Sequence, residues 1–590
     1  MDMKPTITKL PILTPENLKE LMKERLAATK NCETSIPMLW QGLLELPLSV
    51  EGESRSAFYY IPEGTPQGTA MVILNIPEGR EMLPFLEESG WLALAELEGF
   101  CLFLLAPGEN GWKTTAEEAV YVRAAVNEAK MGRYLLAAFS PYIVSYGRIG
   151  NLLQRAAMED PLHTAAAVFV GKGSLNAEYL AEFETKDYCV PDSFDPHALP
   201  LQVPYREIPT PVWILSEEDD QAEAMLTYWK RAARAGEKKE DPVLGTVFQQ
   251  ASQSDYTETD DLVTIAIQPN AGDYCEAEVT KKIYNFLKRY YRYGMGPLSN
   301  TISRRIDPET IGAVRRSFTD SNGFKREYLV YVPATYRDGK TKLPTILAFH
   351  GASQSMRNMF SNGRWYEIAD REGLIIVYPE STLLPIPNEL SRSKAFAYRP
   401  LWMFSSKEAP RADAVYVNEL LDQIISEFPV DEKRIYSNGH SMGCMMSNYL
   451  GSDITGNRLA AIGATSGCLR VREYGANGPV PAFLTIGQFD MWSYRLQDEG
   501  PVADSLDMWL VQDGLSTEKN VNELRTHPTT AYQAGRWNNY VWKDESGTPW
   551  LRFAWISGKH HVHTYEENRI FWEQWFSHWS IGEDGRRYYH

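Results

Sequence analysis

The chain has 590 residues, of which 44% are apolar and 23% charged, so it is not a generally disordered chain. Its 59 Lys and Arg against 77 Asp and Glu give a net charge of −18, which disfavours binding to nucleic acid or to anionic membrane surfaces. We therefore expect neither as a partner.

The sequence also bears on where in the cell the protein is found. No apolar run approaches the roughly 18 residues that a membrane helix needs, and the first residues lack the apolar core of a secretory signal. The six cysteines are spread singly, without a metal-binding CxxC pattern, and a disulfide framework is not expected at this density. We expect a cytoplasmic protein, or a secreted one if a signal segment has been removed.

The first half alternates apolar runs with amphipathic stretches. It predicts strands and helices in this order: strands over 55–62, 71–77 and 99–107, a helix over 116–130, a strand and turn over 142–150, strands over 211–216 and 262–268, and a helix over 276–290. Non-alternating apolar strands are typical of a sheet that is buried on both faces.

The second half repeats that order. It predicts strands over 325–333, 344–350 and 373–379, a helix over 412–428, a strand and sharp turn over 434–443, strands over 481–487 and 550–557, and a final helix over 566–579. We therefore expect two tandem α/β domains, each a mostly parallel sheet covered by helices, over 1–295 and 311–590. The turn-rich stretch 296–310 is the predicted linker.

The strongest chemical motif is Gly439-His440-Ser441-Met442-Gly443, between a predicted strand and a predicted helix. This context is typical of a nucleophile elbow, in which a strained turn projects the serine oxygen from the carboxyl edge of the sheet. We predict that Ser441 is a nucleophile, with a plain helix-capping serine as the alternative.

A serine nucleophile needs a base and a group that orients the base. Asp490, directly after the strand 481–487, is the predicted acid, with Asp504 and Asp507 as less well placed alternatives on a helical stretch. After the last strand, His561 is the favoured base, and His560 and His563 remain alternatives. These histidines lack the carboxylate spacing of a zinc site, so no metal or other cofactor is expected.

Backbone N–H groups are expected to stabilise the oxyanion of the reaction. We predict that they belong to Met442, next to the nucleophile, and to Ala352, in the turn after strand 344–350. His350 precedes the serine in the chain, so we expect it to brace this turn rather than act as the base. Among the aromatic residues near the predicted site, Trp365, Trp402 and Trp492 are candidates for substrate contact.

At these residues the second half resembles the polyhydroxybutyrate depolymerase and feruloyl esterase-like branch of the α/β-hydrolases. The resemblance covers about 311–580 and rests on His350-Gly351 with Gln354, Gly373–Pro379, Gly439–Gly443, Asp490, Trp509–Gly514 and Gly558–His561. It implies hydrolysis of carboxylic esters by Ser441, Asp490 and His561. The chain departs from the family pattern because no cysteine follows Gly351 or stands at Leu515.

The first half looks like a degenerate copy of the same fold. Aligning Gly150 with Gly443 places Arg148 at the position of Ser441, and the stretch after its last strand, 268–279, contains no histidine. We expect this domain to be non-catalytic, with a structural or substrate-binding role.

The predicted function is a serine carboxylesterase that forms an acyl-enzyme on Ser441 and hydrolyses feruloyl, acetyl or polyester-type esters. Its expected partner is a small or oligomeric ester substrate, and a homo-oligomer is open. A serine peptidase or an acyltransferase on the same scaffold, and a non-catalytic binding protein, are the alternatives.

Overall fold

The computed structural model describes residues 6–11, 38, 40–65, 69–131, 134, 140–171, 175–190, 201–216, 220–252, 263–269, 273–292, 302–337, 339–352, 354–385, 398–404, 411–469 and 478–590. The chain divides into two compact units that meet in sequence between Arg305 and Ile306. Of the linker predicted over 296–310, residues 296–301 lie outside the described residues. The remainder contains β15 (Ile302–Arg304) and the start of a short 3-10 turn (Pro308–Ile311).

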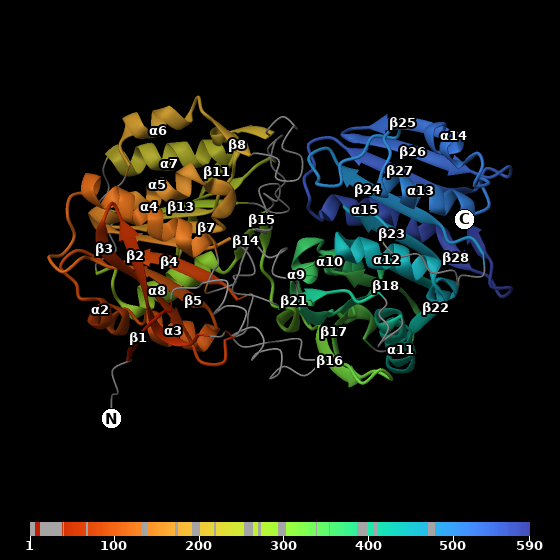
Figure 1. Ribbon diagram of the computed structural model, residues 1–590, viewed down its shortest axis with the longest axis horizontal. Helices are drawn as coiled ribbons and strands as arrows, with labels where there is room; N and C mark the ends of the chain where they lie inside the picture. Colours follow the sequence, from red (N-terminus) through yellow and green to blue (C-terminus); the bar gives the residue numbers. More distant parts are fainter. Residues whose placement is uncertain are drawn as a thin grey trace. The chain divides into compact units, whose positions relative to one another are not determined.

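Unit 1, which ends at Arg305, is built on an 11-stranded mixed sheet. Across the sheet the strands are β1 (Ile7–Lys9), β2 (Gly42–Val50), β3 (Glu53–Ile61), β5 (Cys101–Leu105), β4 (Met71–Asn75), β6 (Tyr142–Tyr146), β7 (Ala166–Val170), β10 (Val212–Ser216), β13 (Thr264–Pro269), β12 (Gly245–Gln250) and β11 (Ala235–Asp241). Helices cover both faces: α2 (Met82–Glu88), α3 (Trp91–Glu98), α4 (Thr115–Met131), α5 (Gly147–Glu159), α6 (Ala177–Phe183), α7 (Asp220–Ala232) and α8 (Ala277–Leu287) (Figure 1).

Unit 2, from Ile306 onward, has a 10-stranded sheet. Its strands across the sheet are β16 (Val314–Thr319), β17 (Lys325–Tyr331), β19 (Ile375–Pro379), β18 (Leu343–Phe349), β22 (Val430–His440), β23 (Ala461–Thr465), β24 (Ala482–Gly487), β27 (Pro549–Ile556), β26 (Trp537–Lys543) and β25 (Thr530–Ala534). Two-stranded ribbons accompany the large sheets: β8 (Asp187–Val190) with β9 (Leu201–Pro204), β14 (Tyr290–Arg292) with β15, β20 (Thr382–Pro385) with β21 (Tyr398–Leu401), and β28 (Trp579–Ile581) with β29 (Arg587–Tyr589).

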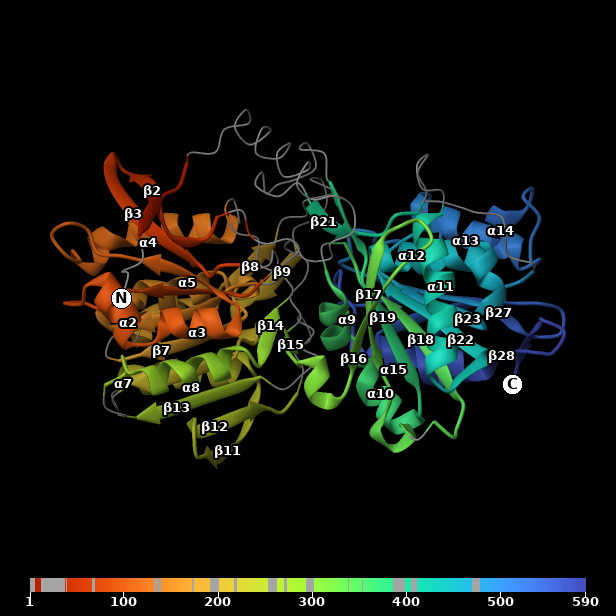
Figure 2. The ribbon, with the colours of Figure 1, turned by 90° about the horizontal axis from the view of Figure 1, so that it is seen from below.

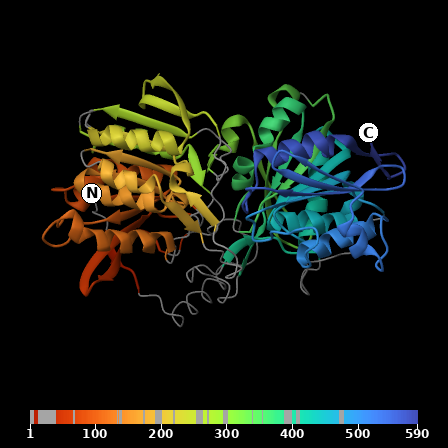
Figure 3. The same ribbon diagram turned by 90° about the horizontal axis from the view of Figure 1, so that it is seen from above.

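The helices of unit 2 cover the sheet in two layers, each with its own apolar core (Figure 2). One core lies under α11 (Ala412–Glu427), α12 (Met442–Ser452) and α13 (Pro501–Gln512). The other lies under α9 (Met356–Asn362), α10 (Trp365–Glu372) and α15 (Tyr565–Gln574); the short α14 (Val521–Thr526) packs on α13. Figure 3 shows each unit from the opposite side, again as a sheet between helices.

The two sheets confirm the internal repeat. From β2 to β11 and from β16 to β25, ten strands follow one another in the same spatial order, with the same parallel and antiparallel pairings throughout. Each unit therefore has the mixed-sheet order of an α/β-hydrolase. The prediction of mostly parallel sheets missed the antiparallel hairpins β11–β12 and β25–β26, because their charged and polar residues lack a strong apolar pattern.

Within the described ranges, no helix is both long and apolar enough to cross a membrane.

Candidate active site

The turn between β22 and α12 gives Ser441 an unusual backbone conformation. Its φ is +56° and its ψ −115°, a strained combination for a residue with a side chain. The flanking glycines permit the turn, because a Cβ on Gly439 would collide with the carbonyl of Gly443, and one on Gly443 with the carbonyl of Phe349. Ser441 itself is half-buried, so its hydroxyl stands at the carboxyl edge of the sheet within reach of solvent.

Loops after two other strands bring an imidazole and a carboxylate to this serine. His561 Nε2 lies 2.9 Å from Ser441 Oγ, and His561 Nδ1 lies 3.0 Å from Asp490 Oδ1. These contacts suit a neutral imidazole that donates from Nδ1 to Asp490 and accepts from the hydroxyl at Nε2. The arrangement can therefore activate Ser441 as a nucleophile.

Asp490 is held in its ionised form. Burial alone acts to raise its pKa, but the His561 imidazole, the Lys559 ammonium and the backbone N–H of Trp492 outweigh this, so the pKa lies below its ordinary value. The Trp492 N–H donates to Asp490 Oδ1 at 2.9 Å. A carboxylate fixed in this way orients the imidazole.

The alternative acids and bases lie elsewhere. Asp504 and Asp507 are on α13, and Asp507 accepts a hydrogen bond from Arg525 Nε at 2.8 Å. His560 stacks on the Phe489 ring, with 5.2 Å between the ring centroids. The structure brings none of these three to Ser441.

Behind His561 lie two further imidazoles. His440 lies between His561 and His563, with its ring centroid 4.9 Å from that of His561 and 6.1 Å from that of His563. Burial, aided by the neighbouring positive groups, lowers the pKa of His440 well below its ordinary value, and neither of its ring nitrogens has a hydrogen-bond partner in the described part of the chain. His563 Nε2 contacts Asn568 Oδ1 at 2.7 Å, so His563 is turned away from the serine.

A buried ion pair, which the sequence gave no reason to expect, anchors the histidine loop. Lys559 and Glu567 both have fully buried side chains, and Lys559 Nζ lies 3.3 Å from Glu567 Oε1. Lys559 Nζ also donates to Thr465 Oγ1 at 3.0 Å and Ser466 Oγ at 2.6 Å, at the end of β23. Since the carbonyl of Thr465 accepts the N–H of Ser441 at 3.0 Å, the pair ties the loop before His561 to the strand beside the elbow.

The turn after β18 lies against the nucleophile. A Cβ added to Gly351 would be 3.2 Å from Ser441 Cβ, and the Gly351 N–H donates to Gln354 Oε1 at 2.9 Å. His350 is fully buried and its Nδ1 contacts the Gly351 carbonyl at 2.8 Å, so this histidine braces the turn.

The two predicted oxyanion residues flank the serine in space. Ala352 follows Gly351 in the turn, and Met442 opens α12, where the first N–H groups have no acceptor inside the helix. Both residues are half-buried.

Two of the three tryptophans differ from the prediction. Trp365 is fully buried and donates to Asn438 Oδ1 at 3.0 Å, while Trp402 is 1% exposed and donates to the His350 carbonyl at 2.7 Å. Trp402 lies in the core under α11, α12 and α13, and Trp365 in the core under α9, α10 and α15, so the expectation that they contact substrate is wrong. The sequence placed them in loops, but their indole N–H groups find partners only inside the fold. Trp492 is half-buried beside Asp490 and remains a candidate.

Unit 1 has the elbow without its serine. The residue with a positive φ after β6 is Gly147, at +62°, so Gly147 and not Arg148 corresponds to Ser441. The predicted alignment is therefore wrong by one residue, because it paired Gly150 with Gly443. In this register Arg148 corresponds to Met442 and Glu78 to Ala352, and the two side chains form an ion pair with each other.

Among the described residues, no group of three or more His, Cys, Asp or Glu side chains is arranged to hold a metal ion.

The sheet order and the strand-to-helix elbow define the fold of an α/β-hydrolase. No family model matches the chain. A bifunctional acetylxylan esterase/xylanase of Neocallimastix patriciarum is 25% identical over 259 residues, which are 44% of this chain and 34% of that protein. The match thus spans about a third of the length of this relative, and it relates the chain to a carboxylic ester hydrolase.

Solved structures of esterases are also similar to the chain. An acetyl xylan esterase from Aspergillus awamori is 13% identical, with 45% of this chain and 99% of that chain covered and a TM-score of 0.33. A ferulic acid esterase from Anaeromyces mucronatus, in complex with ferulic acid, is 18% identical, with coverage of 35% and 83% and a TM-score of 0.25.

The first prediction concerns the buried ion pair. Lys559→Met leaves the Glu567 carboxylate buried without its counter-charge, which costs about 3–5 kcal/mol of unfolding free energy. Urea unfolding of the full chain, followed by tryptophan fluorescence and compared with the wild-type protein, measures the loss. Lys433→Met is the matched control, because Lys433 and its partner Glu583 are exposed, and we expect a loss below about 1 kcal/mol.

The double variant Lys559→Met/Glu567→Met removes both charges, and we expect it to recover at least half of the lost stability. A Lys559→Met protein as stable as the Lys433→Met control contradicts the assignment.

The second prediction concerns acid stability. Burial lowers the pKa of His563 to about 4 from an ordinary value of 6.5, so between these values the unfolded chain binds a proton that the folded chain does not. The contribution of His563 to the free energy of unfolding is complete above pH 6.5. It is lost as the pH falls, by about 2 kcal/mol between pH 7 and 4.5. Urea unfolding at both values should show a smaller loss for His563→Gln than for wild type, whereas the exposed His527→Gln should behave as wild type. Equal losses of unfolding free energy in all three proteins would refute the prediction that His563 causes part of the loss.

Proposed function

We propose that the protein is a serine carboxylic ester hydrolase whose catalytic triad is Ser441, His561 and Asp490. The observation that carries the proposal is the continuous hydrogen-bonded line from the strained serine through the imidazole to the buried carboxylate. The sequence relationship to an acetylxylan esterase supports the same class of reaction.

In the proposed mechanism, His561 accepts the proton of Ser441 Oγ while the oxygen attacks the carbonyl carbon of the ester. The negative charge that develops on the carbonyl oxygen is stabilised by the backbone N–H groups of Met442 and Ala352. The intermediate then expels the alcohol, which takes the proton from His561, and leaves an acyl group on Ser441.

Water completes the cycle. His561 removes a proton from the water as its oxygen attacks the acyl carbon, and the resulting intermediate releases the carboxylic acid and restores Ser441 Oγ–H. Asp490 keeps the imidazole oriented and stabilises its charged form in both halves of the reaction. The buried Lys559–Glu567 pair supports this role, because it holds the chain two residues before His561.

For the substrate we propose an acetyl or feruloyl ester of a carbohydrate. The support comes from the related proteins, which are named as acetylxylan and ferulic acid esterases. Trp492, beside Asp490, is the aromatic side chain that we expect to contact the acyl group. Polyester oligomers should also be tested as substrates.

The third prediction tests the nucleophile. Ser441→Ala should lower kcat/KM on p-nitrophenyl acetate at least 1,000-fold and abolish labelling by a fluorophosphonate, because no other hydroxyl stands at the elbow. Ser426→Ala, an exposed serine on α11, is the control and should keep wild-type activity. If Ser441→Ala still carries label, unit 1 or another serine is reactive and the proposal fails.

Activity assays with other substrates separate the alternative functions. Hydrolysis of feruloyl and acetyl sugar esters without cleavage of p-nitroanilide amides supports an esterase, and faster amide cleavage indicates a peptidase. Acyl transfer to an added alcohol in preference to water indicates an acyltransferase.

The fourth prediction concerns the pH–rate profile. A histidine base is inactive once protonated, so kcat/KM should fall as the pH is lowered. A profile that stays flat to pH 4, measured on a time scale on which the protein remains folded, excludes a histidine base.

A further inference from the structure

A pocket of about 350 Å³ lies on unit 2 away from the triad. It is lined by residues of β25, β26, the first half of β27, the end of α15 and β29. Arg552, at its base, lies four residues before the carboxyl end of β27, which puts it about 13 Å along the strand from the edge that carries the site. The volume is within the range of about 300–1,000 Å³ that ligand pockets have.

The base of the pocket holds a buried positive charge without a negative partner. Arg552 is 6% exposed, and its hydrogen bonds go only to amide oxygens: Nε and Nη2 donate to Asn539 Oδ1 at 3.1 and 2.7 Å, and Nη2 donates to Gln574 Oε1 at 2.9 Å. Within the described ranges, no carboxylate lies within 4 Å of the guanidinium, and its Nη1 makes no hydrogen bond. Burial lowers the pKa of Arg552 below its ordinary value, yet an arginine keeps its charge at neutral pH.

An uncompensated buried charge is unfavourable, and proteins ordinarily pair such a group. Neutral amide oxygens satisfy two of the guanidinium nitrogens, and the Phe483 ring, with its centroid 4.2 Å from the guanidinium carbon, stabilises the cation in part, but no group supplies a full negative charge among the described residues. The arrangement is therefore incomplete without an anion, and Nη1 is the donor left for it.

The rest of the pocket favours a negatively charged ring compound. Tyr532 and Tyr589, each 43% exposed, line the pocket, and Arg552 lies 6.0 Å from the Tyr532 ring centroid. Lys543, also in the lining, adds a second cation whose side chain has no ion pair among the described residues. Tyrosine rings give flat, partly polar surfaces on which another ring can pack.

The nearest acidic residue of the lining is already engaged. Glu573 pairs with Arg569 at 2.6 Å and with Arg371 at 3.2 Å, although Arg371 also pairs with Glu372 at 2.7 Å, so the charge of Glu573 is offset by cations outside the lining. The pocket as a whole is therefore positive, in a chain whose net charge is −18.

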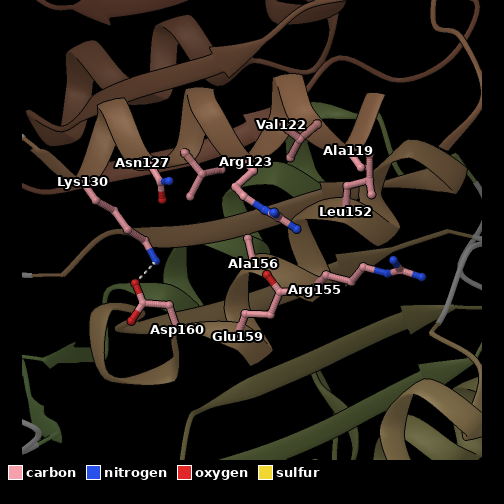
Figure 4. A pocket seen from close by; sticks show the side chains of 11 residues that line it. Ala119, Val122, Arg123, Asn127, Lys130, Leu152, Arg155, Ala156, Glu159 and Asp160 are labelled. Atoms are coloured by element: carbon pink, nitrogen blue, oxygen red, sulfur yellow. Dashed lines mark hydrogen bonds and ion pairs between the residues drawn. The ribbon is translucent and has the colours of Figure 1, made fainter. Parts of the chain in front are cut away.

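A second pocket, on unit 1, serves as a contrast. It lies between α4 and α5, holds about 90 Å³, and its Lys130 already pairs with Asp160 at 2.7 Å (Figure 4). This pocket is small and the charge of Lys130 is already paired, so it is a weaker candidate for binding an anion.

We propose that the unit 2 pocket binds a monocarboxylate that carries a six-membered ring, with the carboxylate on Arg552 and Lys543 and the ring against Tyr532 and Tyr589. A single carboxylate supplies the negative charge that the buried guanidinium lacks, and the acidic chain disfavours the approach of more highly charged anions. A uronic acid and an aromatic acid share this chemistry.

The fifth prediction tests this site on the full chain by isothermal titration calorimetry with benzoate and with glucuronate. We expect millimolar or tighter binding of at least one acid, with the stronger of the two identifying the kind of ring. Benzamide and glucose, the neutral counterparts, should bind at least tenfold more weakly, and phosphate should not compete.

Variants locate the binding. Arg552→Met should weaken binding at least tenfold and Tyr532→Ala at least threefold, whereas Arg586→Gln, which alters an 83% exposed arginine of the same unit, should leave it unchanged. Tyr532 is exposed, so its variant keeps the test decisive if Arg552→Met does not fold. Ester hydrolysis should be unchanged in Tyr532→Ala, which separates this site from the triad.

The proposal is overturned if neither acid binds, if benzamide binds as well as benzoate, if phosphate displaces the acid, or if binding survives both pocket variants.

Discussion

The close backbone approach at the β22–α12 turn is the constraint on which unit 2 depends. Ser441 can take its strained conformation only because Gly439 and Gly443 have no side chains, so that the first turn of α12 can lie against the ends of β18 and β22. The neighbouring strands hold this geometry in register, since the Ser441 N–H donates to the Thr465 carbonyl. The strain is thus offset by the parallel sheet around it, and the serine oxygen is left at the sheet edge.

Around the elbow, the site is built from buried charges and neutral imidazoles. The Lys559–Glu567 pair joins the loop that carries His561 to the end of β23, and Asp490 is held ionised by its neighbours. His440 and His563 stay neutral because burial opposes their protonation, so they add no positive charge beside His561. The two imidazoles behind His561 therefore serve as neutral packing around the site.

Unit 1 shows that the same sheet does not by itself make a site. Its ten corresponding strands follow the order of unit 2, and its elbow keeps a positive φ, yet the residue there is Gly147. The two positions that flank the serine in unit 2 carry Arg148 and Glu78 in unit 1, and these side chains pair with each other. A fold preserves backbone geometry through its core packing, whereas chemistry depends on a few side chains that drift independently.

The sequence by itself determined several of the buried strands and helices in their order along the chain, the internal repeat, and Ser441, Asp490 and His561 as the residues to examine. It could do so because apolar runs report burial locally, and because GxSxG between a strand and a helix has few structural solutions. Only the tertiary structure decided which histidine of Gly558–His563 faces the serine, since adjacent residues on a loop point in directions that spacing does not reveal. It also decided that Trp365 and Trp402 are core residues, that Gly147 is the counterpart of Ser441, and that Lys559 meets Glu567. Each of these depends on contacts between segments far apart in the chain, and such contacts leave no local pattern.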